Sequence, residues 1–382
     1  MKIEQKLWTK DENWSDVSND LGTNVPQVVL AFGGRAVIED ENRYAELKEF
    51  YPKSDILMCS TSGEIMGTRV YDDSLAVSAL FFEKSSVKFS KVSIDNSSES
   101  EEKGIEVVKN LEKEGLVHVM VFSDGLKVNG TSLVHGILSD LPKNVAVTGG
   151  LVGDGPDFKK TVLGLNEVPK EGNIVLVGFY GDSLQIGHGS LGGWDSFGPT
   201  RLITKSNNNV LYELDGRPAL TLYKEYLGDK ESEKLPGSGL LFPLNLKTKD
   251  ELGNEVEVVR TLLGVNEENQ SMIFAGDMPE GAHTNLMKAN FDKLIDGAKG
   301  AASMSEETFG NPEFALLISC VGRKLVLKES IEEETEAVKS QFSENTKMSG
   351  FYSYGEISPV TPTEKQCRLH NQTMTITTFK EE

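Results

Sequence analysis

Val28-Val-Leu-Ala-Phe32, the run from Ala45 to Tyr51 and Ile56-Leu-Met-Cys59 follow one another near the start of the chain and decide its fold class. The first and third are short apolar runs typical of buried strands, and the middle segment has the spacing of an amphipathic helix. A strand, a helix and a second strand in this order predict a parallel strand pair with the helix on one face of the sheet.

The same order recurs where Gly104 to Glu114 has helical periodicity before the apolar run His118-Val-Met-Val-Phe122. From Thr161 onward the pattern changes to short strands joined by polar turns, which predicts antiparallel pairing. A helix from Ala219 to Leu227 follows, and Gly228-Asp229 is a signal that ends it.

The second half of the chain again alternates predicted strands and helices. We expect a strand from Val256 to Val265, a helix from Thr284 to Ala302 with His283 at its start, a strand from Phe314 to Cys320 and an acidic helix from Ile331 to Phe342. The polar run from Asp229 to Lys234 is the predicted boundary between the halves.

The length of 382 residues exceeds what one hydrophobic core usually serves, which predicts two domains. The sequence therefore predicts an α/β protein with two domains, residues 22–228 and residues 235–380, in which mixed β-sheets are flanked by helices.

Composition restricts the location and the partners. No apolar stretch is long enough for a membrane-spanning helix, and the start of the chain lacks a signal sequence, so we expect a cytoplasmic protein that is not inserted in a membrane. The three cysteines form no CxxC pair, which fits a reducing compartment. A formal net charge of -20 opposes nucleic-acid binding, because phosphate groups would be repelled.

Val147-Thr-Gly-Gly-Leu-Val-Gly-Asp-Gly155 places four glycines directly after a predicted strand. Backbone N–H groups in such a loop can approach a bound anion or planar ligand closely, and a tight turn that needs positive φ explains the glycines equally well. The segment lacks the Gly-Lys-Ser/Thr ending of a phosphate-binding P-loop. Gly149, Gly150, Gly153 and Asp154 are the candidate ligand-binding residues here.

Leu57-Met-Cys-Ser-Thr-Ser-Gly-Glu64 also follows a strand and ends in hydroxyl-bearing residues. Ser60 and Thr61 are candidate ligand-binding residues at the carboxyl edge of the sheet, although turn capping explains them equally well. Cys59 has no recognisable histidine partner and is expected to be a buried structural residue, not a nucleophile.

Ile186-Gly-His188-Gly-Ser-Leu-Gly-Gly-Trp194 sets one imidazole among glycines, at what we expect to be an accessible strand end. Such an imidazole can ligate the iron of a non-covalently bound haem b while the opposite face stays open to a gas. A hydrogen-bonded histidine at a turn is the alternative.

Two segments near the carboxyl end complete the candidates. Gly350-Phe-Tyr-Ser-Tyr-Gly-Glu-Ile-Ser-Pro359 can form one wall of a small-molecule pocket, with Tyr352 and Glu356 as its binding residues, or it can be a packed corner. Cys367, His370 and Cys320 are too few ligands for a closed tetrahedral metal site, which favours a structural role. No acid/base pair is evident, so the chain is not expected to be an enzyme.

Several of these segments together resemble the FIST sensory family, whose members carry an amino-terminal and a carboxy-terminal FIST domain. The first domain is suggested by Cys59-Ser-Thr-Ser-Gly-Glu-Ile65 and Thr148-Gly-Gly-Leu-Val-Gly-Asp-Gly155, and the second by Gly350-Phe-Tyr-Ser-Tyr-Gly-Glu-Ile-Ser358 and Leu369-His-Asn-Gln-Thr-Met-Thr375. The resemblance covers nearly the whole chain.

The resemblance implies a ligand-binding input module of signal transduction. It is closest to stand-alone members, which include the haem-binding nitric-oxide sensors called NosP that act on a partner histidine kinase. On that reading the chain senses nitric oxide through haem ligated by His188, or by His370, and regulates a histidine kinase or other signalling protein by contact. The alternative is a haem-free sensor of an amino acid or similar small metabolite.

Overall fold

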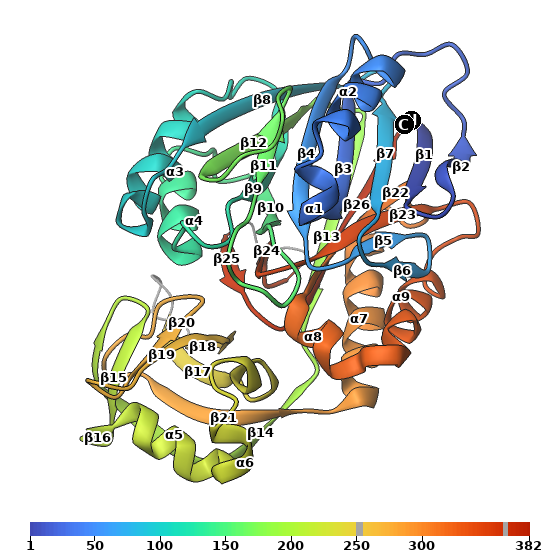
Figure 1. The fold of residues 1–382 in the computed structure, drawn as a ribbon. Helices are drawn as coiled ribbons and strands as arrows, with labels where there is room; N and C mark the ends of the chain where they lie inside the picture. The colour runs from blue at the N-terminus through green and yellow to red at the C-terminus, as the bar shows by residue number, and fades with distance from the viewer. Residues whose placement is uncertain (250–254, 362–365) are drawn as a thin grey trace.

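The computed structural model describes residues 1–249, 255–361 and 366–382. It confirms the predicted α/β class: within these residues the strands form four sheets, three of six strands and one of eight, with helices packed against them. Figure 1 shows a larger body above a smaller lobe, and the lobe consists of residues 194–289. We call this segment the inserted lobe, because the chain leaves the body at its start and returns at its end.

The body contains three units of similar topology, which are residues 1–82, residues 86–180, and residues 184–193 together with 290–382. The elements of the first unit are β1 (Lys2–Thr9), β2 (Asn13–Asn19), β3 (Val28–Gly34), α1 (Arg35–Ile38), α2 (Glu41–Phe50), β4 (Asp55–Thr61), β5 (Glu64–Met66), β6 (Arg69–Tyr71) and β7 (Leu75–Phe81). Those of the second are β8 (Ser86–Ser93), α3 (Ser100–Lys109), β9 (Leu116–Ser123), α4 (Gly130–Leu138), β10 (Ala146–Leu151), β11 (Leu163–Leu165) and β12 (Asn173–Tyr180).

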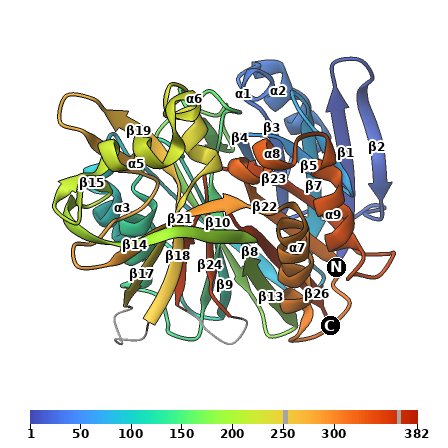
Figure 2. The same cartoon turned by 90° about the horizontal axis from the view of Figure 1, so that it is seen from below.

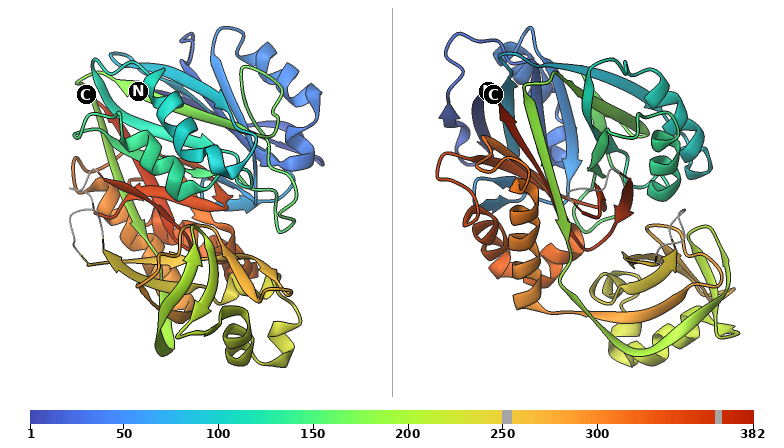
Figure 3. Two further views of the ribbon diagram at one scale, coloured as in Figure 1. Left: turned by 90° about the vertical axis from the view of Figure 1, so that its left-hand side faces the viewer. Right: turned by 180° about the vertical axis from the view of Figure 1, so that it is seen from behind.

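The third unit begins with β13 (Leu184–Leu191) and resumes after the inserted lobe. Its further elements are α7 (Phe291–Glu306), β22 (Phe314–Cys320), α8 (Val321–Leu327), α9 (Ile331–Lys339), β23 (Lys347–Ser353), β24 (Gly355–Pro359), β25 (Cys367–His370) and β26 (Met374–Glu381). Figure 3, in the view from behind, shows β13 continuing into the lobe as β14.

Each unit has one parallel strand pair at its centre: β3 with β4, as the strand–helix–strand pattern predicts, β9 with β10, and β22 with β23. An antiparallel strand then returns along the first strand of each pair, β7 on β3, β12 on β9 and β26 on β22. The central strands are continuous apolar runs because both faces of each sheet are covered.

The three units exchange short strands in a cycle. β5 of the first unit pairs with β23 of the third, β24 of the third pairs with β10 of the second, and β11 of the second pairs with β4 of the first. The carboxyl ends of the central strands of all three units are therefore held together by backbone hydrogen bonds.

The inserted lobe has its own sheet and its own hydrophobic core. Its elements are β14 (Trp194–Asn207), β15 (Val210–Leu214), β16 (Arg217–Pro218), α5 (Ala219–Leu227), α6 (Asp229–Ser232), β17 (Leu244–Lys249), β18 (Glu255–Arg260), β19 (Leu262–Asn266), β20 (Ser271–Phe274) and β21 (His283–Ala289). Seen from below in Figure 2, β14 and β21 run beside each other between lobe and body, where Trp194 pairs with Ala289.

Two details differ from the sequence-based expectations. The single helix expected from Thr284 to Ala302 is wrong, because residues up to Ala289 form β21 and the helix α7 begins at Phe291, where the Asn290 side chain accepts a hydrogen bond from the Lys293 N–H. The polar run after Gly228 lies inside the lobe as α6. The division into residues 22–228 and 235–380 stays a prediction, while strands from both ranges share two of the body's sheets.

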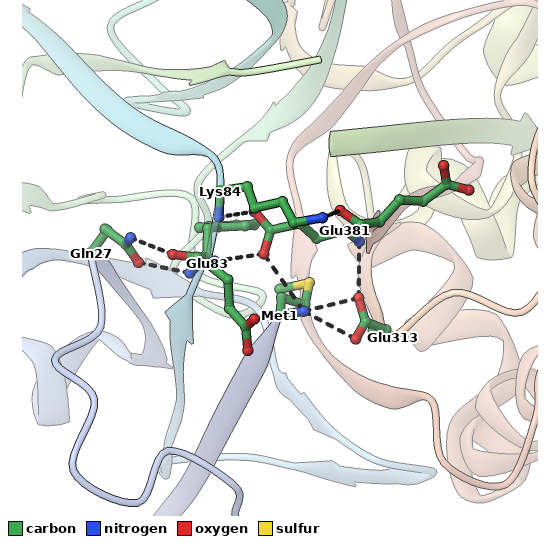
Figure 4. A network of polar contacts seen from close by, with 8 residues as sticks. Met1, Gln27, Glu83, Lys84, Glu313 and Glu381 are labelled. Atoms are coloured by element: carbon green, nitrogen blue, oxygen red, sulfur yellow. Dashed lines mark hydrogen bonds and ion pairs between the residues drawn. The ribbon is translucent and has the colours of Figure 1, made fainter. Parts of the chain in front are cut away.

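A polar network links the first and third units near the two ends of the chain (Figure 4). The Glu381 carboxylate accepts the N–H groups of Glu83 and Lys84 at 2.6 and 2.9 Å. Glu313 accepts the Met1 amine at 3.1 Å and the Glu381 N–H at 2.9 Å. The network fixes the turn after β7 against the end of β26.

Among the residues that the structure describes, no helix has the length and apolarity needed to span a bilayer.

Candidate ligand-binding site

A cavity of about 700 Å³ opens at the carboxyl ends of β3 and β4. This is within the usual size range of small-molecule sites. All three units contribute: residues 34–36, 61–64 and 72–73 come from the first, residues 154–157 from the second, and Val321, Lys324, Leu325 and Lys328 from α8 and its end in the third. Strand carboxyl ends in α/β folds are the usual place for a ligand, because the loops there are free to vary.

Charged groups of both signs line this cavity. Arg35 begins α1 directly after β3, and its guanidinium lies 3.5 Å from the Asp157 carboxylate. Asp72 and Asp73 lie on the turn before β7. A guanidinium binds a carboxylate with paired hydrogen bonds, and a carboxylate pair attracts an ammonium group, so the cavity is chemically suited to a ligand that carries both charges.

Lys324 joins the third unit to the first across the cavity. Its ammonium donates to the Ser62 carbonyl at 2.9 Å, pairs with the Asp72 carboxylate and lies 5.6 Å from the centre of the Tyr352 ring. Gly63 has a φ of 135°, which favours glycine, and a Cβ atom there would lie 2.3 Å from the Lys324 Nζ.

Glu64 forms the buried floor of the cavity and has a counterpart in the third unit. The Glu64 carboxylate accepts hydrogen bonds from the Thr61 hydroxyl and from the Ser74 hydroxyl and N–H. The Glu356 carboxylate accepts hydrogen bonds from the same kinds of donor, namely the Ser353 hydroxyl and the Thr373 hydroxyl and N–H. Burial raises the pKa of each carboxyl to about 7, although these hydrogen bonds act in the opposite direction.

We expect the substitution Glu356→Gln to change how stability depends on pH. The carboxyl ionises near its ordinary value of 4.5 in the unfolded chain and near 7 in the folded protein, so its contribution to stability is present below 4.5 and is lost as pH rises through 7. Glutamine does not titrate. The free energy of unfolding of the variant, relative to the wild type, should therefore rise by about 1–3 kcal/mol between about pH 4.5 and pH 7.5.

Urea unfolding at a series of pH values measures this difference. The exposed Glu114→Gln is the control and should leave the pH dependence of stability unchanged. A difference between Glu356→Gln and wild type that stays constant over this range would show that Glu356 is ionised throughout.

Two of the residues predicted to bind a ligand, Thr61 and Asp154, lie in the wall of the cavity. Gly153 lies beside them, where its added Cβ would be 2.3 Å from the Ser62 Oγ. The Asp154 carboxylate accepts the N–H groups of Lys159 and Lys160 at 3.0 and 2.8 Å and the Tyr354 hydroxyl, which fixes the loop after β10.

Gly149, Gly150, Ser60 and Tyr352 lie in the buried sheet layers and do not line this cavity. Added Cβ atoms at Gly149 and Gly150 would meet the Val121 carbonyl at 1.9 Å and the Ile318 side chain at 2.8 Å, so both glycines allow close strand packing. The Ser60 Oγ accepts the Val162 N–H at 3.0 Å, and the Tyr352 hydroxyl donates to Glu334 at 3.0 Å.

His188 is not at an accessible strand end as expected from the glycines around it. It lies within β13, opposite Thr377 of β26, and is 3% exposed. The glycines on either side are explained by α7, because an added Cβ at Gly187 or Gly189 would lie 1.8 or 2.1 Å from a carbonyl of that helix. The alternation of a strand turns the imidazole to the opposite face, inside the protein.

This setting does not fit haem bound at His188, because the imidazole is buried inside the protein, where no open axial position is left for an iron. His370 is also buried, and its Nε2 lies 3.0 Å from the Ser358 carbonyl. Burial lowers the pKa of His370 to about 4, so it is neutral at ordinary pH. Cys320 and Cys367 are buried in the strands β22 and β25.

Sequence reasoning missed Arg35, Asp72, Asp73 and Lys324. Arg35 had a usable signal, since it directly follows Gly33-Gly34 at the carboxyl end of a strand that the sequence predicts. Lys324 ends the segment Ser319-Cys-Val-Gly-Arg-Lys324, which resembles the second FIST domain, but its place at the cavity was not foreseen, because only the exchange of strands between units brings α8 to β4.

Comparisons with known proteins cover most of the chain. The model of the FIST N domain matches residues 27–217, and the model of the FIST C domain matches residues 219–359. A protein of Methanocaldococcus jannaschii, named only as uncharacterized, is 25% identical over 371 residues, which cover 87% of this chain and 68% of that protein.

The two family matches meet inside the inserted lobe, and together they include every residue that lines the cavity. Residues 34–157 of the lining lie in the first match, and residues 321–328 lie in the second. The chain belongs to the FIST family of sensory proteins, with a FIST N domain followed by a FIST C domain.

Proposed function

We propose that this chain is a haem-free sensor of a small metabolite of the amino-acid class, which binds in the cavity described above. The observation that carries the proposal is the pairing of Arg35 with acidic residues around one cavity, since an amino acid presents a carboxylate and an ammonium group together. Glu64 and the hydroxyl of Thr61 add polar contacts at the floor.

The position of the cavity supports a role in signalling. A ligand in it would contact the FIST N segment through residues 34–157 and the FIST C segment through residues 321–328. Its affinity would differ between two arrangements of these segments, and binding would favour the arrangement with the better contacts. The output in this proposal is contact with a partner signalling protein such as a histidine kinase.

Nitric-oxide sensing through haem b remains a prediction from the family resemblance. The burial of His188 and His370 does not favour it. The spectrum of the protein mixed with haem, before and after nitric oxide, tests it separately.

A thermal-shift screen with the twenty common amino acids tests the proposed function. We expect at least one to raise the unfolding temperature by a few degrees, because a ligand at one hundred times its dissociation constant stabilises the folded state by about 2.7 kcal/mol. A flat response to all twenty, together with a saturable Soret band that shifts with nitric oxide, would contradict the proposal and favour the haem sensor.

A further inference from the structure

The short helix α8 lies between the cavity and the inserted lobe. Val321, Lys324 and Leu325 line the cavity. Lys324 holds the helix to the first unit through the Ser62 carbonyl at 2.9 Å and the Asp72 carboxylate. A ligand that engages Lys324 or Asp72 would compete with this pair, so its binding would act directly on α8.

Gly322 connects α8 to the lobe. An added Cβ at Gly322 would lie 2.4 Å from the side-chain amide of Gln372, so helix and glutamine are in close contact. The Gln372 amide donates to the Leu240 carbonyl at 3.0 Å and to the Thr261 hydroxyl at 3.1 Å, both in the lobe. One fully buried side chain therefore joins α8 to the lobe surface.

Arg323 connects α8 to both chain crossings between body and lobe. Its guanidinium donates to the Gly192 carbonyl at 2.9 Å, just before β14, and to the Leu294 carbonyl at 2.7 Å, in the first turns of α7 after β21. It is fully buried and paired with Glu334 of α9. The segments on which the lobe would turn are thus held by the same helix that lines the cavity.

We propose that α8 transmits occupancy of the cavity to the inserted lobe, through Gln372 at the lobe surface and Arg323 at the two crossings. The inserted lobe is then the part of the molecule whose position reports the ligand. This inference rests on the proposed function for the chemistry of the ligand, but the mechanical link can be tested with no ligand present.

Hydrogen exchange of the ligand-free protein tests the link. Lys324→Met removes the ammonium that holds α8 to the first unit and keeps most of the side-chain volume. We expect at least threefold faster exchange at the Thr261 amide, which donates to the Asn371 side chain across the interface between lobe and body. Lys299→Met, on the exposed face of α7, is the control and should leave this rate unchanged.

A change confined to residues 61–74 would overturn the proposal, since α8 would then not carry the disturbance to the lobe. If Lys324→Met instead accelerates exchange throughout the core strands, the variant is generally destabilised. A second variant, which perturbs the link from the side of the lobe, then tests the proposal. Gln372→Leu removes the donor to the lobe, and because coupling is reciprocal it should accelerate exchange in residues 321–328 at least threefold relative to β9. Unchanged exchange in α8 would overturn the proposal, whereas a failed amino-acid screen would contradict only the proposed function.

Discussion

Replacing Arg323 by alanine is expected to lower the free energy of unfolding by about 3–5 kcal/mol, because the buried Glu334 carboxylate loses its counter-ion. Both side chains are fully buried, and the Arg323 Nε lies 2.6 Å from the Glu334 Oε1. The substitution also removes the donors to the Gly192 and Leu294 carbonyls. Urea unfolding at neutral pH measures the loss.

Arg69→Ala is the matched control, since Arg69 pairs with Glu332 at 3.2 Å with a side chain that is 68% exposed. Exposed pairs contribute about 0–1 kcal/mol. The double variant Arg323→Met with Glu334→Leu should recover much of the lost stability, because no buried charge remains. A loss below about 1 kcal/mol for Arg323→Ala would show that water reaches the pair.

Arg35→Ala is expected to weaken binding of the amino acid found by thermal shift by about 10- to 100-fold. In the proposed complex the guanidinium binds the ligand carboxylate, and a hydrogen bond to a charged group contributes about 1.5–3 kcal/mol. Isothermal titration calorimetry measures the affinity. Lys159→Ala is the control, because Lys159 lies 4.0 Å from the same Asp157 and is 73% exposed.

A wild-type affinity in Arg35→Ala would contradict the assignment of the ligand carboxylate to Arg35. A loss of the same size in Arg35→Ala and Lys159→Ala would also contradict it, because it would point to the overall charge around the loop after β10 and not to a direct contact.

The fold could be predicted from the sequence wherever one segment determines its own structure. The apolar runs that became β3, β9 and β22 and the helix α5 are of this kind, because burial on both faces or a clear periodicity leaves little choice. A strand near Leu163 is predicted and observed as β11, but the pairing of β5 and β11 with strands of another unit could not be predicted, since nothing local indicates those partners.

The candidate site could be predicted only in part, for a related reason. Thr61 and Asp154 follow strands that the sequence predicts, and both line the cavity. The glycines around His188 have the composition of an open ligand site, but they serve the close packing of α7 on β13. Glycine allows close approach by a ligand or by another part of the chain, and sequence alone does not distinguish the two.

The Leu369-His370-Asn371-Gln372 segment shows how a family motif can serve the fold. The Asn371 side chain accepts the Thr261 N–H at 3.3 Å, and Gln372 donates to the Leu240 carbonyl. The Leu369 carbonyl accepts from Arg260, again from the lobe. The motif therefore docks the inserted lobe onto the body.

A crystal structure of the protein with the amino acid that raises the unfolding temperature most would test the central claim directly. We expect the ligand between Arg35, Thr61 and Lys324, in contact with both the FIST N and the FIST C segments. A ligand bound elsewhere, or in contact with only one of the two segments, would contradict the claim that this cavity is the sensory site.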